Sequence, residues 1–227
     1  GMNSMPARWA VIWDMDGVLI DSEEAHFAAW SRLFQEEGIP YHRDLFLSTF
    51  GQRNDAVIRH LLGPSITAKQ IRAYDQRKEA YFRAMIPTLV KPLPGALALL
   101  AQLAREGALQ AIGSSGPRDN VLAVVEHLGV RAYFGAIVSG NDVQHGKPAP
   151  DTFLTAAQRL DVSPARCVVL EDAPQGIAAA KNAGMHCVAI TSTRTAAALA
   201  QAQWVVDHLT QLDAKRLRQI ALSDTID

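Results

Sequence analysis

Two aspartates, Asp14 and Asp16, directly follow the apolar run Trp9–Trp13, which has the character of a buried strand. The carboxyl end of such a strand in an α/β sheet opens into the crevice where these sheets bind ligands. Two carboxylates placed one residue apart there repel each other, so they need a cation, a shared proton, or both. The pair therefore indicates a metal-assisted reaction rather than a structural role.

Polar residues also follow three later runs of strand character. They are Ser114 and Ser115 after Leu109–Gly113, Lys147 in the loop after Ala136–Ser139, and Glu171 and Asp172 after Cys167–Leu170. Taken singly, the acidic pair could cap a helix, the serines could form a turn, and the lysine could be solvated. Because parallel strands bring their carboxyl ends to one edge of a sheet, the joint pattern instead predicts one crevice with four carboxylates, an ammonium and one or two hydroxyls.

The elements that must hold these residues follow from the spacing of apolar runs. Strands are predicted at Ala10–Trp13, Leu109–Gly113, Ala136–Ser139, Cys167–Leu170, Cys187–Ile190 and Trp204–Val206. From residue 94 onward they alternate with helices that begin near Pro94, Pro117, Pro150 and Pro174, and the Ala-rich stretch 196–202 is predicted to be helical. This alternation predicts an α/β fold with a parallel sheet and right-handed crossovers.

One segment interrupts the alternation. Between Asp21 and about Val90 no run of strand character occurs, and helical patterns predict helices at Glu24–Glu37, Asp55–Leu62 and Thr67–Met85. We therefore expect a catalytic core made of residues 1–20 and 91–227, and an inserted helical cap domain at 21–90. An insertion tethered at both ends beside the first strand is well placed to act as a lid.

The composition excludes several classes of protein. Lys and Arg number 22 against 23 for Asp and Glu in 227 residues, which disfavours nucleic acid or an anionic membrane as the main partner. No apolar run approaches the ~20 residues of a membrane span, and no signal-type segment is expected. Cys167 and Cys187 are predicted to be buried free thiols, which fits a reducing cytoplasm. We expect a monomer.

The residue types at the crevice favour phosphoryl chemistry. No His/Cys cluster is present, so carboxylate oxygens predict Mg²⁺ rather than zinc, with an open position for a phosphate oxygen. Lys147 and Ser114 could then bind the remaining phosphoryl oxygens. The phosphate-binding patterns G-x-x-x-x-G-K-[ST] and G-x-G-x-x-G are absent. This leaves Asp14 as a carboxylate nucleophile that forms an aspartyl-phosphate.

These motifs, in this order and with the sequences Gly-Lys-Pro-Ala-Pro-Asp (146–151) and Leu-Glu-Asp-Ala-Pro-Gln-Gly-Ile (170–177), closely resemble the haloacid dehalogenase superfamily of phosphotransferases. The resemblance covers nearly the whole chain. It implies a Rossmann-like three-layer core with strand order 5-4-1-2-3 and a helical cap inserted after the first motif. It also implies that Asp14 is the nucleophile and Asp16 the general acid/base. Mg²⁺ would be held by Asp14, the backbone carbonyl of Asp16, and Asp172, with Glu171 bound directly or through water.

Within the superfamily the chain looks similar to β-phosphoglucomutase-like phosphatases. The segment 21–30, with His26 and Trp30, resembles the linker and first cap helix of the mutase, and Lys78 falls near a cap lysine. At two places where the mutase binds a second phosphate, the sequence of this chain differs. Arg53 stands in a Gly-Gln-Arg loop that is one residue short, and Arg118 follows a Gly-Pro pair where the mutase has other polar groups.

The function that this pattern favours is Mg²⁺-dependent hydrolysis of a small phosphorylated metabolite, most of all a sugar phosphate. Phosphatase and mutase differ in whether water or a sugar hydroxyl attacks the aspartyl-phosphate, so β-phosphoglucomutase remains the alternative. A third class also combines an acidic pair, a phosphorylatable Asp, a Ser/Thr and a Lys. These are non-catalytic receiver domains, which are about half this length and lack a cap. A sugar-phosphate-binding protein without catalytic activity is a related alternative.

Overall fold

The computed structural model describes residues 7–224. Within it the chain divides into two compact units, one formed by Ser22–Val90 and the other by the residues up to Asp21 and from Lys91 onward. Each unit has its own buried apolar cluster. Among the helices of residues 7–224, none has both the length and the apolar character needed to cross a membrane.

The larger unit is built on a six-stranded parallel sheet in the order β5-β4-β1-β6-β7-β8. The strands are β1 (Ala10–Trp13), β4 (Leu109–Gly113), β5 (Ala136–Val138), β6 (Cys167–Glu171), β7 (His186–Ile190) and β8 (Trp204–Val206). Counted along the chain, the first five have the order 5-4-1-2-3, as the resemblance implied. The sixth strand, β8, pairs with β7 and extends that edge of the sheet.

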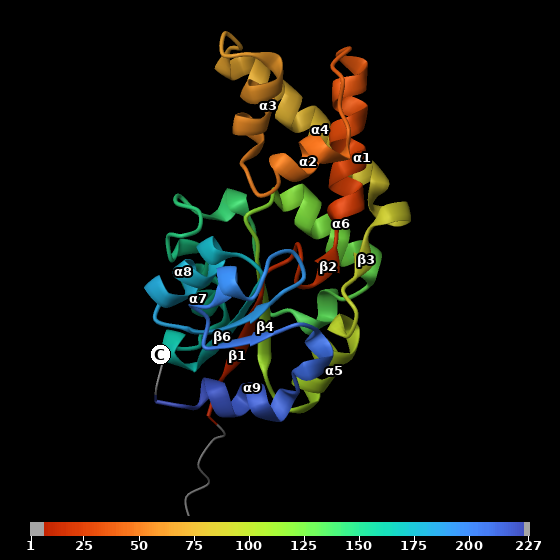
Figure 1. The fold of residues 1–227 in the computed structure, drawn as a ribbon. Coiled ribbons are helices and arrows are strands. Elements are labelled where there is room, and N and C mark those ends of the chain that lie inside the picture. The colour runs from red at the N-terminus through yellow and green to blue at the C-terminus, as the bar shows by residue number, and fades with distance from the viewer. Residues whose placement is uncertain (1–6, 225–227) are drawn as a thin grey trace, which may run out of the picture. The chain divides into compact units, whose positions relative to one another are not determined.

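Helices cover both faces of this sheet, as Figure 1 shows. They are α5 (Ala96–Arg105), α6 (Arg118–Leu128), α7 (Asp151–Leu160), α8 (Pro174–Asn182) and α9 (Ala214–Ala221). Ala10 and Ile12 belong to the apolar cluster that β1 shares with α7 and α8. Because side chains alternate along a strand, Val11 and Trp13 point to the other face, where α5 and α9 lie. The result is the predicted three-layer core.

A buried polar pair fixes β1 against this second face. The indole Nε1 of Trp13 donates to the side-chain oxygen of Gln110 at 2.9 Å, and the amide nitrogen of Gln110 donates to the carbonyl of Leu100 at 3.0 Å. Trp13 is fully buried and Gln110 nearly so. Each of these polar groups therefore has a partner where water is excluded.

The two segments that connect the units pair with each other. β2 (Ile20–Asp21) and β3 (Lys91–Pro92) form a short antiparallel ribbon, and Leu93 donates to the carbonyl of Leu19 at 2.9 Å. In the sequence these segments are recognisable only as the two tethers of the helical insertion. Their pairing escaped prediction because two residues are too few to show an alternating pattern.

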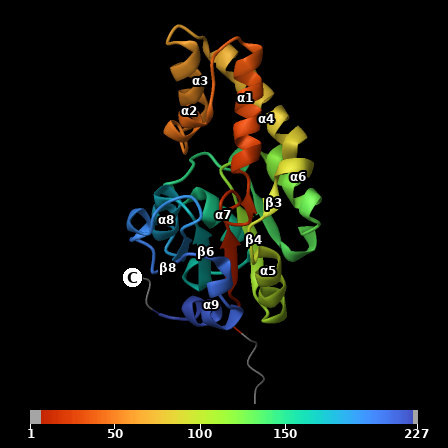
Figure 2. The same cartoon turned by 45° about the vertical axis from the view of Figure 1, so that its right-hand side comes forward.

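The smaller unit is helical. It contains α1 (Glu23–Glu36), α2 (Arg43–Ser48), α3 (Asn54–Leu62) and α4 (Ala68–Leu89). Helices α1 and α4 lie side by side, as Figure 2 shows. An aromatic cluster forms the interior, with Trp30 stacked on Phe34 at 5.5 Å and Phe46 packed from α2.

The prediction of a helix at 196–202 is wrong. The stretch forms only the short 3₁₀ turn Ala197–Leu199, between two loops. Alanine has high helix propensity, but a segment of seven residues is too short to form a helix without packing of an apolar face.

Replacing Trp13 by Phe is expected to lower the free energy of unfolding by about 1–3 kcal/mol, because the buried side-chain oxygen of Gln110 loses its donor. Urea denaturation followed by circular dichroism measures the effect. The matched control is Trp204→Phe, at a half-buried position on edge strand β8, which should change stability much less. Equal effects of the two substitutions would contradict this account of the Trp13–Gln110 pair.

Candidate active site

The first aspartate of the motif lies where β1 ends. Its backbone N–H still pairs with Leu170 of β6 at 3.0 Å, so Asp14 is held by the sheet itself. The chain then turns through Asp16 and Gly17, whose φ of +79° favours glycine. A Cβ on Gly17 would lie 2.2 Å from Oδ2 of Asp172, so the turn passes directly against the second acidic motif.

The acidic pair lies where β6 ends. Oε1 of Glu171 accepts the backbone N–H groups of Asp172 at 2.9 Å and Ala173 at 3.3 Å. The carboxylate lies over the first turn of α8, where a Cβ on Gly176 would be 1.9 Å from Cδ of Glu171. Glycine at position 176 therefore leaves the space that this buried carboxylate occupies.

Lys147 joins the two strand ends. Its ammonium donates to Oδ1 of Asp14 at 3.1 Å, to Oε2 of Glu171 at 2.7 Å, and to the carbonyl of Gly113 at 3.1 Å. These three acceptors match the three protons of the ammonium. Its side chain is only 7% exposed, so it acts as a buried counter-charge rather than as a solvated surface lysine.

Asp14, Glu171 and Asp172 each offer a carboxylate oxygen within 4.8 Å of the others, and they form a candidate metal site. In residues 7–224 no other group of His, Cys, Asp or Glu side chains meets in this way. The donor set fits a hard cation, since every ligand atom is oxygen. Glu171 already uses Oε1 for backbone N–H groups and Oε2 for Lys147, which favours Asp14 and Asp172 as the direct ligands.

The three carboxylates of the cluster, when ionised, outnumber the two nearby cations, Lys147 and Arg194. Burial, followed by the charge of Glu171, raises the pKa of Asp14 well above its usual value, although Lys147 opposes the shift. The same two causes raise the pKa of Asp172 to about 6. Burial alone would lower the pKa of Lys147, but the neighbouring Asp14 and Glu171 outweigh it and raise that pKa.

The serines at the end of β4 differ in their surroundings. Ser114 is buried, and its hydroxyl accepts the N–H of Gly116 at 3.0 Å. It follows Gly113, whose carbonyl accepts from Lys147, so it belongs to the same edge of the sheet as the carboxylates. Ser115 is exposed.

Arg118 is bound to another part of the core. Its guanidinium pairs with Asp142, which Arg159 also contacts at 3.5 Å. These residues line a concavity of about 340 Å³ beside edge strand β5. Asp142 also accepts hydrogen bonds from Ser139, through the backbone N–H and through the hydroxyl of that residue.

The cap residues proposed for substrate binding lie in the smaller unit, where two of them form one polar cluster. Lys78 is 2% exposed, and its ammonium contacts Nδ1 of His26 at 2.9 Å and donates to Glu79 at 2.8 Å. Arg53 is instead 89% exposed and pairs with Asp55 at 3.3 Å. The positive charge of Lys78 is thus balanced by the carboxylate of Glu79, whereas Arg53 lies at the surface.

The structure adds residues that the sequence analysis did not single out. In the loop after β7, Ser192 donates to the carbonyl of Gly17, and Thr193 donates to Asp172 at 2.6 Å. Arg194 lies 3.7 Å from the same carboxylate oxygen. The only available signal was the position of this loop after a parallel strand, because its sequence has no pattern typical of a site.

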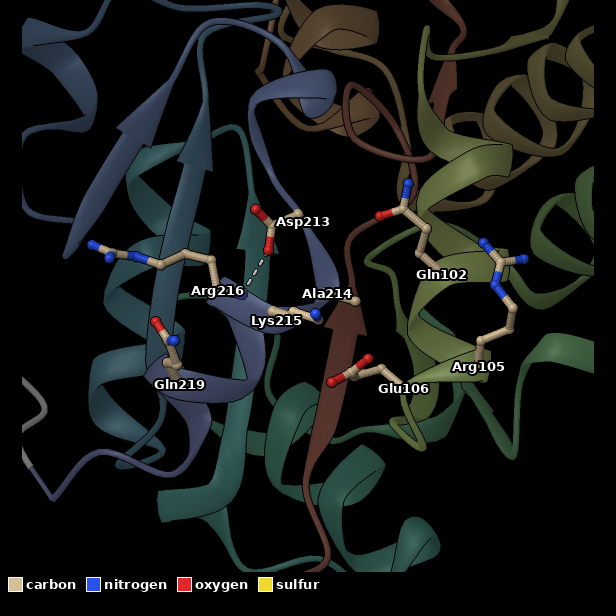
Figure 3. A pocket seen from close by; sticks show the side chains of 8 residues that line it. All are labelled: Gln102, Arg105, Glu106, Asp213, Ala214, Lys215, Arg216 and Gln219. Atoms are coloured by element: carbon tan, nitrogen blue, oxygen red, sulfur yellow. Dashed lines mark hydrogen bonds between the residues drawn. The ribbon is translucent and has the colours of Figure 1, made fainter.

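A larger concavity of about 480 Å³ lies between α5 and α9 (Figure 3). Its lining mixes both charges, with Arg105 and Lys215 beside Glu106. Asp213 caps α9 by accepting the N–H of Arg216 at 2.8 Å. None of the carboxylates of the candidate metal site lines this concavity, so it is separate from the candidate active site.

Comparison with known proteins gives a consistent result. The family described as haloacid dehalogenase-like hydrolase matches residues 11–190. A validoxylamine A 7'-phosphate phosphatase from Streptomyces hygroscopicus subsp. limoneus is 35% identical over 204 residues, which are 88% of this chain and 94% of that protein. A β-phosphoglucomutase from Bacillus subtilis is 38% identical over 188 residues, 80% of this chain and 82% of the relative.

A solved structure extends the comparison to the fold. The HAD hydrolase of family IA, variant 3, from Entamoeba histolytica superposes with a TM-score of 0.86 at 26% identity. The match covers 95% of this chain and all of the other.

The stabilising effect of a divalent cation is expected to grow with pH. Because the folded-state pKa of Asp172 is raised from 3.8 to about 6, the metal-free folded protein binds more protons than the unfolded chain between these values. Its free energy of unfolding therefore falls as pH rises from about 4 to about 6, and stays lower above that. A cation competes with the proton for the same carboxylate.

Thermal unfolding in EDTA and in magnesium chloride, at pH 5.0 and pH 7.5, measures this effect. The cation should raise the melting temperature more at pH 7.5. Sodium chloride of equal ionic strength is the control for screening. An equal rise at both pH values would contradict the raised pKa of Asp172.

Proposed function

The chain belongs to the haloacid dehalogenase-like hydrolase family, and on this basis we propose that it hydrolyses phosphate monoesters of small metabolites with Mg²⁺ as cofactor. The observation that carries the proposal is the position of Asp14. It ends β1 beside a lysine and two further carboxylates, where one of its oxygens is held by Lys147 at 3.1 Å. A carboxylate oriented in this way suits attack on phosphorus.

In the first step Asp14 attacks the phosphoryl group, and the bond from phosphorus to the leaving oxygen breaks. Asp16 donates its proton to that oxygen, which leaves as an alcohol. Lys147 and the hydroxyl of Ser114 stabilise charge on the phosphoryl oxygens. A bound Mg²⁺ would supply further neutralisation of the charge that gathers between the phosphoryl group and the carboxylates.

In the second step a water molecule attacks the aspartyl-phosphate. Asp16, now ionised, takes a proton from this water, and the carboxylate of Asp14 leaves as inorganic phosphate forms. One residue, Met15, separates the two aspartates, and the chain turns at Asp16 and Gly17 after β1 has ended, so their side chains need not point the same way. This separation is what allows one carboxylate to attack while the other transfers the proton.

Binding of phosphate also requires Lys147 to exchange partners. Its three protons serve Asp14, Glu171 and Gly113 in the substrate-free protein. We propose that a phosphoryl oxygen replaces the carbonyl of Gly113, the neutral member of this set. The two carboxylates then keep the ammonium charged and in place.

The substrate class that we propose is a phosphorylated sugar or a related polyol. One relative is a validoxylamine A 7'-phosphate phosphatase, and another is a fructose-1-phosphate phosphatase from Escherichia coli. Polar groups of the cap, His26 and Lys78 among them, would recognise the hydroxyl groups of such a substrate. We further propose that the core and cap units correspond to the predicted catalytic and lid domains.

β-Phosphoglucomutase remains a second candidate, because a mutase is 38% identical to this chain. A mutase must hold a second phosphate while the first is transferred. Arg118 pairs with Asp142, Lys78 pairs with Glu79, and Arg53 pairs with Asp55. Hydrolysis is favoured because the loop of Arg53 is one residue shorter than in the mutase, and because Arg118 stands where the mutase has other polar groups.

The protein with Mg²⁺ is expected to release inorganic phosphate from members of a sugar-phosphate panel, and Asp14→Asn should reduce kcat by at least on the order of 10³-fold because the nucleophile is lost. A phosphate-release assay measures both. Asp161→Asn is the matched control, because Asp161 has a positive φ that asparagine also tolerates. It should leave kcat unchanged.

A coupled assay for interconversion of β-glucose 1-phosphate and glucose 6-phosphate distinguishes the two candidates. Interconversion without net phosphate release would replace the phosphatase by the mutase. Phosphate release that survives in Asp14→Asn would contradict the aspartyl-phosphate mechanism itself.

A further inference from the structure

The loop that follows β7 contacts both segments that carry the acidic motifs of the candidate active site. The hydroxyl of Ser192 donates to the carbonyl of Gly17, in the turn after Asp16. The hydroxyl of Thr193 donates to Oδ2 of Asp172 at 2.6 Å, at the end of β6. Two consecutive side chains of a third strand end therefore bind the two segments that carry the acidic motifs.

The direction of the hydrogen bond between Thr193 and Asp172 is set by the chemistry of Arg194. Its Nη1 lies 3.0 Å from Oγ1 of Thr193, and a guanidinium only donates. The threonine oxygen therefore accepts from the arginine, and its own proton is directed to Asp172. The same Nη1 also donates to the backbone carbonyl of Asp172 at 3.4 Å.

Close packing prevents this arrangement from shifting. A Cβ on Gly17 would lie 2.2 Å from Oδ2 of Asp172 and 3.0 Å from Cγ2 of Thr193, so the three residues meet at one point. A carboxylate is planar, and fixing one of its oxygens by a short hydrogen bond restricts the direction of the other. Asp172 is itself 5% exposed, so water competes little for this bond.

We propose that Thr193 is a positioning residue for the metal, which orients Asp172 toward the cation, with Arg194 polarising its hydroxyl and Ser192 holding the adjoining turn. Outer hydrogen bonds to metal ligands commonly change metal affinity by about 10–100-fold. The proposal rests on the Mg²⁺ site of the proposed function, but it concerns the affinity for the cation and holds whichever phosphorylated substrate is used.

Titration calorimetry of the metal-free protein with magnesium chloride tests the proposal. Thr193→Val keeps the shape of the side chain and removes the donor, so it should raise the Kd for Mg²⁺ about 10–100-fold. Thr193→Ser keeps the hydroxyl and should restore most of the affinity. Thr191→Val is the matched control in the same loop, because Thr191 donates to the exposed Asp207 instead, at 2.9 Å.

Melting temperatures in EDTA separate positioning from stability. Thr193→Val loses the hydrogen bonds to Asp172 and Arg194, and Thr191→Val loses the one to Asp207. Both variants should remain folded, but only the first should lose the stabilisation by magnesium chloride. If Thr193→Val does not fold, Arg194→Gln serves instead and should weaken Mg²⁺ binding several-fold. Equal Kd values for the wild type, Thr193→Val and Arg194→Gln would overturn the proposal.

The test remains informative if the proposed function fails. Weaker Mg²⁺ binding by Thr193→Val in a protein that releases no phosphate from any sugar phosphate would support the positioning role and contradict only the phosphatase assignment. A wild-type protein that binds no Mg²⁺ at millimolar concentration would overturn the positioning role together with the metal site.

Discussion

Three carboxylates and one lysine meet at the carboxyl edge of the sheet, and the excess of negative charge there is the constraint on which the rest of the site depends. Burial, and after it the charge of Glu171, raises the pKa of Asp14 and Asp172 and penalises the ionised form of the cluster. Lys147 and Arg194, with two positive charges, offset only part of this charge. A divalent cation, followed by a phosphoryl group drawn to that cation, is the natural complement of such an arrangement.

The fold provides the space and rigidity that this cluster requires. Gly17 and Gly176 leave room for the carboxylates of Asp172 and Glu171, which any larger residue would displace. The side chains extend from strand ends whose backbones are fixed in the sheet, so little entropy is lost when a ligand binds. A third strand end contributes Thr193, whose hydroxyl donates to the carboxylate of Asp172.

Much of this architecture could be predicted because it has a regular signal. Asp14, Lys147 and the acidic pair each follow a buried run, and the periodicity of such runs reports a parallel sheet. The ribbon of β2 and β3 and the role of Thr193 could not be predicted in this way. Each depends on contacts between residues far apart in the chain, and a hydroxyl in a loop carries no periodic pattern. Alanine-rich 196–202 shows the opposite error, since propensity alone predicted a helix that packing does not support.

The measurement that tests the charge imbalance most directly is the stability of Asp172→Asn at pH 7.5, by urea denaturation in EDTA and in magnesium chloride. Removing one buried negative charge should make the metal-free variant more stable than the wild type by about 1–3 kcal/mol, given the raised pKa of Asp172. The variant should also gain little from magnesium chloride, whereas the wild type gains substantially. A variant that is less stable than the wild type in EDTA, and that magnesium chloride stabilises as fully, would contradict the account.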